Sequence, residues 1–280
     1  MKIRIISGLV ALVVLFLALL AFDTFIFEIL VSAVCVIVVY ELSYNTGIVK
    51  DKFLLGVAFV MSAAIPFILL YTNTLILICI LFVYLMLLVL RFLKVYETVK
   101  FQDIAALLTF SLLVPFDLSI FIGFRENFEV EGIFYVLLCL VGAWVSDSGA
   151  YFTGTFFGKT KMAPKISPKK TVEGFVGGLI SSFLGFMLFG FIMTKSAPFM
   201  YPQIASFDVN YIVLALIAPI CSSAGVLGDL FASVIKRQTG IKDYGNIMPG
   251  HGGIMDRFDS VLFVAPTLYF ILNFVKIVSI

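Results

Sequence analysis

Residues 9–22 read LVALVVLFLALLAF, and this apolar run decides the fold of the chain. A bilayer core of ~30 Å takes about 20 apolar residues as a helix, and runs of similar length recur along the sequence. The run does not alternate between apolar and polar residues, as a membrane β-strand does. Because backbone groups in lipid must be paired within the protein, such runs predict transmembrane helices.

The composition of the 280 residues supports the same class of protein. Apolar residues make up 62% and charged residues 13% of the chain, and the mean hydropathy is +1.15. A soluble fold of this composition would expose large apolar patches, which excludes a soluble enzyme, a disordered chain and a secreted disulfide scaffold. The net charge of +2 argues against a nucleic-acid partner. The cysteines stand singly in apolar runs and are interpreted as small hydrophobic residues: Cys35, Cys79, Cys139 and Cys221.

Polar clusters divide the chain into about nine predicted transmembrane helices, so the predicted fold class is an all-α integral membrane protein. The predicted helices cover residues 5–22, 24–42, 53–71, 74–90, 104–124, 132–157, 171–193, 209–235 and 259–279. Sixteen of the 19 basic residues lie in alternate loops. By the positive-inside tendency, we expect the N-terminus in the cytoplasm and the C-terminus outside.

Glycine usage predicts two regions, because seventeen of the 21 glycines follow residue 130. Glycine in lipid permits close helix contacts and irregular backbone beside a ligand. We therefore expect residues 1–130 to form an N-terminal transmembrane scaffold of about five helices. Residues 131–280 are predicted to form a C-terminal catalytic region of about four helices with cytosolic loops. Two glycine pairs have the spacing of packed helix faces: Gly154 with Gly158, and Gly174 with Gly178.

Carboxylates within apolar segments are costly in lipid, so each needs a partner or a function. Three are interpreted as capping, pairing or interfacial groups: Glu28, Glu41 and Asp117. Asp147 precedes Lys159 by about 18 Å of helix, and Asp229 precedes Lys236 by about 10 Å. Both acids are therefore expected in the cytosolic half of the bilayer, where a functional site could form.

Residues 233–259 read SVIKRQTGIKDYGNIMPGHGGIMDRFD and contain four basic residues, three acids and the single histidine. Helical spacing predicts one face for Asp229, Ser233 and Lys236, and a shared face for Asp256 and Asp259. Carboxylates that converge at one rim repel each other unless cations hold them, and hard oxygen ligands suit Mg²⁺. The predicted metal ligands are Asp229, Asp256 and Asp259, with Mn²⁺ as an alternative ion and room for a second cation.

The same stretch has the residue types that bind polyphosphates. Lysine and arginine supply fixed charge and hydrogen-bond donors, and glycines let backbone amides approach an anion. The candidate phosphate-binding residues here are Ser233, Lys236, Arg237, Lys242, Gly250, Gly252, Gly253 and Arg257. His251 could donate to a phosphate or a leaving group, or could only order its loop. The other interpretation is a topogenic cytoplasmic loop with ordinary ion pairs.

Residues 158–174 read GKTKMAPKISPKKTVEG and gather five lysines within twelve residues. A cap at the next helix would place two lysines beside its amino end, where an anion is favoured. This adds four candidates: Ser167, Lys169, Lys170 and Thr171. Asp147 could join the metal ligands, balance Lys169 or bind cytosine. The alternative is that these lysines only set topology or contact anionic lipids. A P-loop is excluded because Thr153 stands where that motif needs glycine.

The pattern S-x-I-K-R-x4-K-D-x-G-x2-M-P-G-H-G-G-x2-D-R-x-D in residues 233–259 resembles the signature of CDP-diacylglycerol synthases, also called phosphatidate cytidylyltransferases. SPKKTVEG in residues 167–174 resembles their second shared block. The resemblance covers about residues 144–259; before residue 131 only length and hydropathy agree. It implies that Asp229, Asp256 and Asp259 match the metal-binding acids of the family, and that the lysines and arginines match its phosphate-binding positions.

The resemblance further implies a bacterial inner-membrane enzyme with its active site facing the cytosol. Such an enzyme condenses CTP with phosphatidic acid in the presence of magnesium, and releases CDP-diacylglycerol and pyrophosphate. Membrane lipids are its surroundings, and a homodimer is an expectation from kinship. The candidates for catalysis are then Asp229, Asp256, Asp259, His251 and Asp147.

The chemistry of this reaction agrees with the residue types. A phosphate monoester has its second pKa near about 6 and is largely dianionic at neutral pH, so no strong general base is needed. Catalysis should rest on charge neutralisation and in-line positioning at the α-phosphorus. Two rival functions remain. A CTP-dependent kinase of a polyprenol or phytol would release cytidine diphosphate, and a cation-coupled transporter would line a path across the bilayer with its polar residues.

Overall fold

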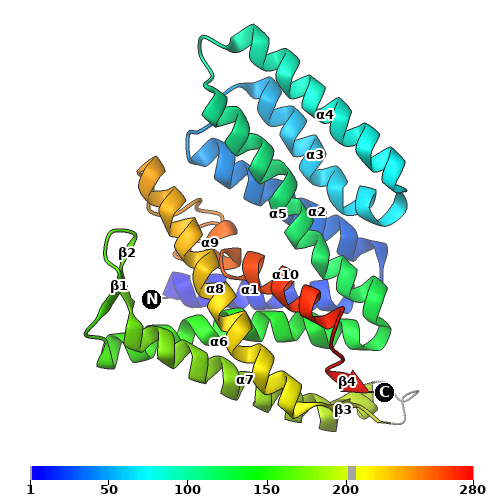
Figure 1. The fold of residues 1–280 in the computed structure, drawn as a ribbon, viewed down its shortest axis with the longest axis vertical. Helices are drawn as coiled ribbons and strands as arrows, with labels where there is room; N and C mark the ends of the chain where they lie inside the picture. The colour runs from blue at the N-terminus through cyan, green and yellow to red at the C-terminus, as the bar shows by residue number, and fades with distance from the viewer. Residues whose placement is uncertain (1, 201–205, 280) are drawn as a thin grey trace. The chain divides into compact units, whose positions relative to one another are not determined.

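The computed structural model describes residues 2–200 and 206–279, most of which are helical (Figure 1). The helices are α1 (Lys2–Leu20), α2 (Phe25–Tyr40), α3 (Lys52–Tyr71), α4 (Thr74–Val95), α5 (Phe101–Phe128), α6 (Gly132–Phe157), α7 (Val172–Met200), α8 (Tyr211–Thr239), α9 (Met255–Phe258) and α10 (Val261–Leu272). A π-helical turn, η1 (Glu41–Asn45), continues α2, and a 3-10 turn, η2 (Glu129–Glu131), precedes α6. The strands are β1 (Lys161–Ala163), β2 (Ser167–Thr171), β3 (Asp208–Val209) and β4 (Val278–Ser279).

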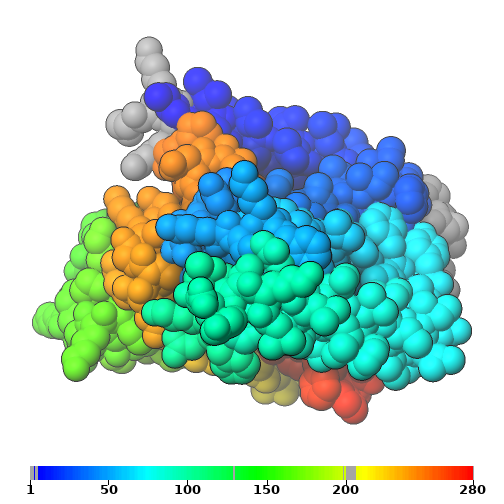
Figure 2. Space-filling model, turned by 90° about the horizontal axis from the view of Figure 1, so that it is seen from above, coloured from blue at the N-terminus to red at the C-terminus, as the bar shows by residue number. Residues whose placement is uncertain are grey.

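Seven helical segments of the described chain are long and apolar enough to cross a membrane. They are Phe25–Asn45, Lys52–Tyr71, Thr74–Val95, Phe101–Phe128, Gly132–Phe157, Val172–Ala197 and Tyr211–Thr239. Helix α4 shows the lipid-facing character most clearly, because only 11% of its most apolar window is buried. Residues of α4, coloured cyan, form a continuous part of the surface seen in Figure 2. The prediction of a helical, multi-pass membrane protein is confirmed.

The predicted count of nine spans is not confirmed, because two apolar helices are shorter: Ile6–Leu20 and Val261–Leu272. The single helix predicted over residues 259–279 is wrong. Helix α10 has 12 residues, about 18 Å of length, and ends at Leu272. The chain then forms β4, which pairs antiparallel with β3. Hydropathy missed this end because the residues after Leu272 remain mostly apolar in a paired strand.

Two small sheets were also absent from the all-α prediction. Strands β1 and β2 form one antiparallel pair, and β3 and β4 form the other. The first hairpin contains the predicted lysine-rich segment, whose Ser167 pairs with Ala163 and whose Thr171 pairs with Lys161. The hydropathy pattern could not reveal these strands, because each has only two to five residues.

The chain forms two compact units. Unit 1 consists of Met1–Ile122 and Lys236–Arg257, and unit 2 consists of Gly123–Ile235 and Phe258–Ile280. The break after residue 122 lies near the predicted boundary at residue 130. The glycine-rich loop after α8, in contrast, packs with the N-terminal residues, although the sequence analysis assigned it to the C-terminal region.

Unit 1 has an apolar core between α3, α4 and α5, in which Leu54, Leu88 and Leu107 are completely buried. Asp51 caps α3, because its Oδ1 accepts a hydrogen bond of 2.9 Å from the Leu54 backbone N–H. Its Oδ2 pairs with Arg91 of α4 at 2.7 Å. The hydrogen bond from Arg91 holds the pKa of the Asp51 carboxyl below its ordinary value. This pair therefore joins the start of α3 to the end of α4.

Unit 2 is organised around α6 and α7, which lie side by side (Figure 1). Their contact depends on glycine. A Cβ at Gly149 would collide with the side chain of Ser181, and one at Gly177 would collide with Thr153. A Cβ at Gly174 would lie 3.2 Å from the Cα of Gly154. The helix-packing interpretation of Gly154 and Gly174 is confirmed, and the close approach of these helices fixes the base of the β1–β2 hairpin.

We expect Gly149→Ala to destabilise the protein and Gly56→Ala in α3 not to. The methyl group at 149 collides with Ser181, and such overpacking costs about 1–3 kcal/mol. Nothing lies within 4 Å of a Cβ at Gly56, where alanine favours the helix by roughly 0.5–1 kcal/mol. Thermal unfolding in detergent should give a lower midpoint for G149A and an equal or higher one for G56A. Equal midpoints would contradict the α6–α7 packing.

Candidate active site

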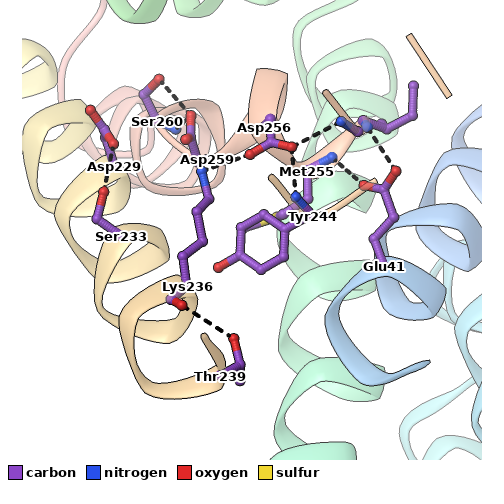
Figure 3. A network of polar contacts seen from close by, with 12 residues as sticks. Glu41, Asp229, Ser233, Lys236, Thr239, Tyr244, Met255, Asp256, Asp259 and Ser260 are labelled. Atoms are coloured by element: carbon purple, nitrogen blue, oxygen red, sulfur yellow. Dashed lines mark hydrogen bonds and ion pairs between the residues drawn. The ribbon is translucent and has the colours of Figure 1, made fainter. Parts of the chain in front are cut away.

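Asp256 organises the glycine-rich loop of unit 1. Its side chain is only 4% exposed, and its Oδ2 accepts backbone hydrogen bonds of 2.9 Å from Tyr244 and from Gly253. Its Oδ1 pairs with the Lys236 ammonium at 2.6 Å (Figure 3). The carboxylate therefore joins the two ends of the loop and the last turn of α8.

Lys236 lies between this carboxylate and an aromatic ring. Its Nζ is 5.0 Å from the ring centroid of Tyr244, and the ring side chain is completely buried. A cation over the face of an aromatic ring is attracted by the ring quadrupole. Lys236 also stands in the last turn of α8, where a positive charge is favoured by the helix dipole. These three interactions fix the position of the ammonium group.

The glycines give the loop its shape. The backbone N–H of Met248 donates to the Gly252 carbonyl at 2.9 Å, and the N–H of His251 donates to the Met248 carbonyl at 2.8 Å. Gly250 and Gly252 have φ angles of 80° and 87°, a region that other residues rarely adopt. A Cβ at Gly252 would also lie 2.6 Å from the Asp256 Oδ2. The tight turn around Asp256 therefore requires these glycines, and their role in phosphate binding stays a prediction.

His251 contacts α1. Its Nδ1 forms a hydrogen bond of 2.8 Å with the hydroxyl of Ser7. A Cβ at the next residue of α1, Gly8, would lie 3.7 Å from the imidazole. Helix α1 thus orders the side chain of His251. The sequence had predicted that His251 either donates to phosphate or orders its loop.

Glu41 belongs to this site as well, although the sequence pattern did not indicate it. Glu41 is completely buried, and its two carboxylate oxygens accept backbone hydrogen bonds from Ile254 at 3.0 Å and from Met255 at 2.7 Å. The available signal was a carboxylate in an apolar helix, which the sequence analysis interpreted as a capping or pairing group. That interpretation is confirmed, but its partner lies more than 200 residues away and could not be read from the sequence.

In unit 2, Asp229 has a lysine partner. The Lys170 ammonium of β2 lies 2.7 Å from the Asp229 Oδ2 and donates to the Val226 carbonyl at 3.5 Å. The Ser233 hydroxyl donates to the Asp229 Oδ1 at 3.3 Å (Figure 3). The predicted common face of Asp229 and Ser233 is confirmed. The lysine of this cluster comes from the hairpin.

Asp147 and Asp259 meet at Ser260. The Ser260 hydroxyl donates to the Asp147 Oδ2 at 2.7 Å, and the Ser260 backbone N–H donates to the Asp259 Oδ1 at 2.9 Å. Helix α8 packs against this segment through Gly228, where a Cβ would collide with the Asp259 carbonyl. Unit 2 therefore brings an acid of α6 and the acid before α10 to one serine.

The lysine-rich segment ends at the cap of the next helix, α7. Thr171, which is 4% exposed, accepts a hydrogen bond of 3.0 Å from the Gly174 backbone N–H and caps α7. Glu173 accepts hydrogen bonds of 3.1 Å from the backbone N–H groups of Lys159 and Thr160. Thr171, and not Ser167, is thus the cap that the sequence predicted for one of the two.

The remaining predicted phosphate-binding side chains lie on the surface of their units. Four of them are exposed: Lys169, Arg237, Lys242 and Arg257. Within residues 2–200 and 206–279, no group of three His, Cys, Asp or Glu side chains lies close enough to hold a metal ion. Lysines neutralise Asp229 and Asp256 instead. Metal binding by Asp229, Asp256 and Asp259 therefore stays a prediction.

Comparison with known proteins agrees with the sequence signature. A family model described as "Cytidylyltransferase family" matches residues 2–275. The chain belongs to the cytidylyltransferase family. A protein named phosphatidate cytidylyltransferase from Bacillus subtilis strain 168 is 41% identical over 176 residues, which are 63% of this chain and 61% of that protein. The resemblance found in the sequence is confirmed.

Staphylococcal relatives have the same name. The protein of Staphylococcus saprophyticus is 44% identical over 153 residues, 54% of this chain and 54% of that protein. The protein of Staphylococcus aureus strain COL is 42% identical over 153 residues, which are 54% of this chain and 54% of that protein. The chain thus spans between about half and three-fifths of the length of the curated relatives it matches.

We expect Lys236→Met to lower the stability of this family member, with Lys242→Met as the matched control. Without its lysine, the buried Asp256 carboxylate loses its cation, at a cost on the order of 3 kcal/mol. Lys242 lies in the same loop but is exposed, and surface charges contribute less than about 1 kcal/mol. Thermal unfolding should give a clearly lower midpoint for K236M alone. An unchanged K236M midpoint would contradict the ion pair.

Proposed function

We propose that this protein is a phosphatidate cytidylyltransferase, which condenses CTP with phosphatidic acid to form CDP-diacylglycerol and pyrophosphate. The observation that carries the proposal is the 41–44% identity to relatives of that name, together with membership of the cytidylyltransferase family. The helical membrane fold supports it, because one substrate is a lipid and its phosphate lies at the membrane interface.

We propose that Lys170 and Lys236 bind substrate phosphates. Their side chains are 20% and 16% exposed, so each ammonium is partly withdrawn from water, where its attraction for a phosphate is stronger than in bulk solvent. The lipid phosphate is largely dianionic at neutral pH. The difficulty of the reaction is then to bring two polyanions together, and fixed lysines reduce that repulsion. The exposed Lys169, Arg237, Lys242 and Arg257 would add positive charge around the phosphates.

The donor chemistry of Asp229, Asp256 and Asp259 fits a divalent cation of the hard type, Mg²⁺ or Mn²⁺. Asp229 and Asp256 each already bond a cationic group, the lysine ammonium, at 2.7 and 2.6 Å. When bound, such an ion would neutralise phosphate charge and activate the α-phosphorus. His251, held by Ser7, would donate to a phosphate oxygen, and Asp147 would orient its neighbours through Ser260.

We propose that the protein lies in the bacterial inner membrane with its active site facing the cytosol. The asymmetry of the basic residues supports a cytoplasmic N-terminus and a cytoplasmic position of the 158–174 and 233–259 segments. This is the side from which CTP arrives. The C-terminus would then lie outside if nine segments cross the bilayer, and a homodimer is retained as a proposal from family kinship.

Product analysis tests the proposed reaction. Purified protein is mixed with phosphatidic acid vesicles, magnesium and each of CTP, dCTP, UTP and ATP in turn. We expect CTP to yield equal amounts of pyrophosphate and CDP-diacylglycerol. Cytidine diphosphate as the product, with a polyprenol as acceptor, would instead favour the lipid kinase. Counterflow of a solute in vesicles without nucleotide turnover would favour a transporter.

Substitution of the acids tests the metal proposal. We expect Asp256→Asn and Asp259→Asn to lower magnesium-dependent turnover by about 10²-fold or more, because each removes a charged oxygen from the cation and the phosphates. Asp208→Asn is the control, since Asp208 is exposed on β3. Chelation of divalent ions should abolish wild-type turnover. Near-normal activity of both variants in folded protein would refute the metal role.

A further inference from the structure

We propose that Glu41, on the second helix of the chain, is a positioning residue for the proposed cytidylyl transfer. Its carboxylate holds the start of α9, which contains Asp256, a predicted metal ligand, and Arg257, a predicted phosphate-binding residue. The inference rests on the proposed function for its effect on turnover. The structural part of the proposal does not depend on activity: an N-terminal helix sets the conformation of the glycine-rich loop.

The carboxylate is built into the loop. Glu41 is 0% exposed, and each of its oxygens accepts one hydrogen bond from the backbone, from Ile254 and from Met255 (Figure 3). A buried carboxylate is stable only when it is paired or fully hydrogen-bonded. The two N–H groups, which begin a helix and have no carbonyl partner within it, are satisfied in return. Each side of the contact therefore depends on the other.

The helix that contains Glu41 changes geometry at this residue. The α-helical part ends at Tyr40, and Glu41 begins the π-helical turn η1, a wide turn that is frequent at functional sites. Asn45 at the end of the same turn donates from its side-chain amide to the Tyr244 carbonyl at 2.8 Å. One π-turn thus holds the loop at Tyr244 and again at Ile254 and Met255.

The glycines of the loop support the same interpretation. A Cβ at Gly245 would lie 2.5 Å from the Glu41 Oε1, and a Cβ at Gly253 would collide with both carboxylate oxygens. The backbone of the loop therefore passes directly against the carboxylate. The volume of Glu41 therefore requires glycine at both positions, while the predicted role of Gly253 in phosphate binding stays a prediction.

Glu28 provides a natural comparison. It is also buried, at 2% exposure, and lies on α2, which η1 continues. There it accepts a hydrogen bond of 3.0 Å from the Tyr71 hydroxyl. Tyr71 is at the end of α3, so this contact joins two helices far from the loop in sequence. Replacement of Glu28 therefore reports the general cost of removing a buried acid from α2, whereas replacement of Glu41 also releases the loop.

The test uses Glu41→Gln and Glu28→Gln in the full-length protein. Glutamine keeps the size of the side chain but offers one acceptor oxygen, and its NH₂ group faces a backbone N–H that also donates. We expect kcat of E41Q to fall between about tenfold and 10²-fold, as for a misplaced reacting group. KM for CTP should change less than about threefold, because the phosphate-binding lysines remain. E28Q should keep kcat within about twofold.

A second readout does not depend on activity. Amide hydrogen exchange of residues 244–255 should become faster in E41Q and stay unchanged in E28Q, because exchange reports local opening of the loop. A double-mutant cycle tests whether the Glu41 side chain occupies the space beside Gly245. Gly245→Ala should slow turnover in the wild type but cost much less in the Glu41→Ala background, where the methyl group has room.

The outcomes separate the two proposals. If the wild type forms no CDP-diacylglycerol, the proposed function fails. Hydrogen exchange alone then shows whether Glu41 holds the glycine-rich loop. Unchanged exchange in E41Q would overturn the inference, whatever the activity. Equal losses of kcat in E41Q and E28Q would also overturn it, because the effect would then be general destabilisation. Additive costs in the Gly245 cycle would exclude direct contact.

Discussion

A carboxylate that leaves water must be paired or hydrogen-bonded, and this constraint determines the polar part of the protein. Asp256 meets it with two backbone N–H groups and Lys236. Glu41 meets it with two further N–H groups of the same loop. The backbone donors of the loop are therefore the partners of two buried acids, and these bonds favour the observed conformation. In a membrane protein with few charged residues, these acids supply order that a soluble loop would obtain from water and surface contacts.

The two units pair their carboxylates through different structural elements. In unit 1 the acids come from a helix and a loop, and glycine provides the close approach of backbone to carboxylate. In unit 2 a lysine on a β-hairpin reaches Asp229 on α8, and the tight contact of α6 with α7 fixes the hairpin. A lysine–aspartate pair is thus present in each unit, held by a different local structure. Displacement of either lysine removes the cationic partner of its aspartate, which then keeps only hydrogen-bond donors.

The sequence predicted what depends on local pattern. Hydropathy located the long helices, spacing placed Ser233 beside Asp229, and helix-start chemistry offered Thr171 as a cap. Prediction from the sequence failed where a contact between residues distant in the chain determines the structure. The face shared by Asp229 and Lys236 suggested a common cluster, but Lys236 pairs with Asp256 and Asp229 pairs with Lys170. The segment after α10 contains β4, which pairs with β3. The role of Glu41 depends on a partner more than 200 residues away. One sequence contains no signal for such pairings.

The lysine–aspartate pairs also constrain how the proposed reaction can work. If Lys236 binds a substrate phosphate, it weakens its bond to Asp256, and the freed carboxylate is left in a partly dry site. Another cation is then required at Asp256, so binding of the anionic substrate and binding of a cation become linked. By thermodynamic reciprocity, each must strengthen the other by the same factor. The same reasoning applies to Lys170 and Asp229. Under the proposed function, a nucleotide that binds together with a magnesium ion would meet both needs, and the lysine–aspartate pairs would then be the state before substrate binds.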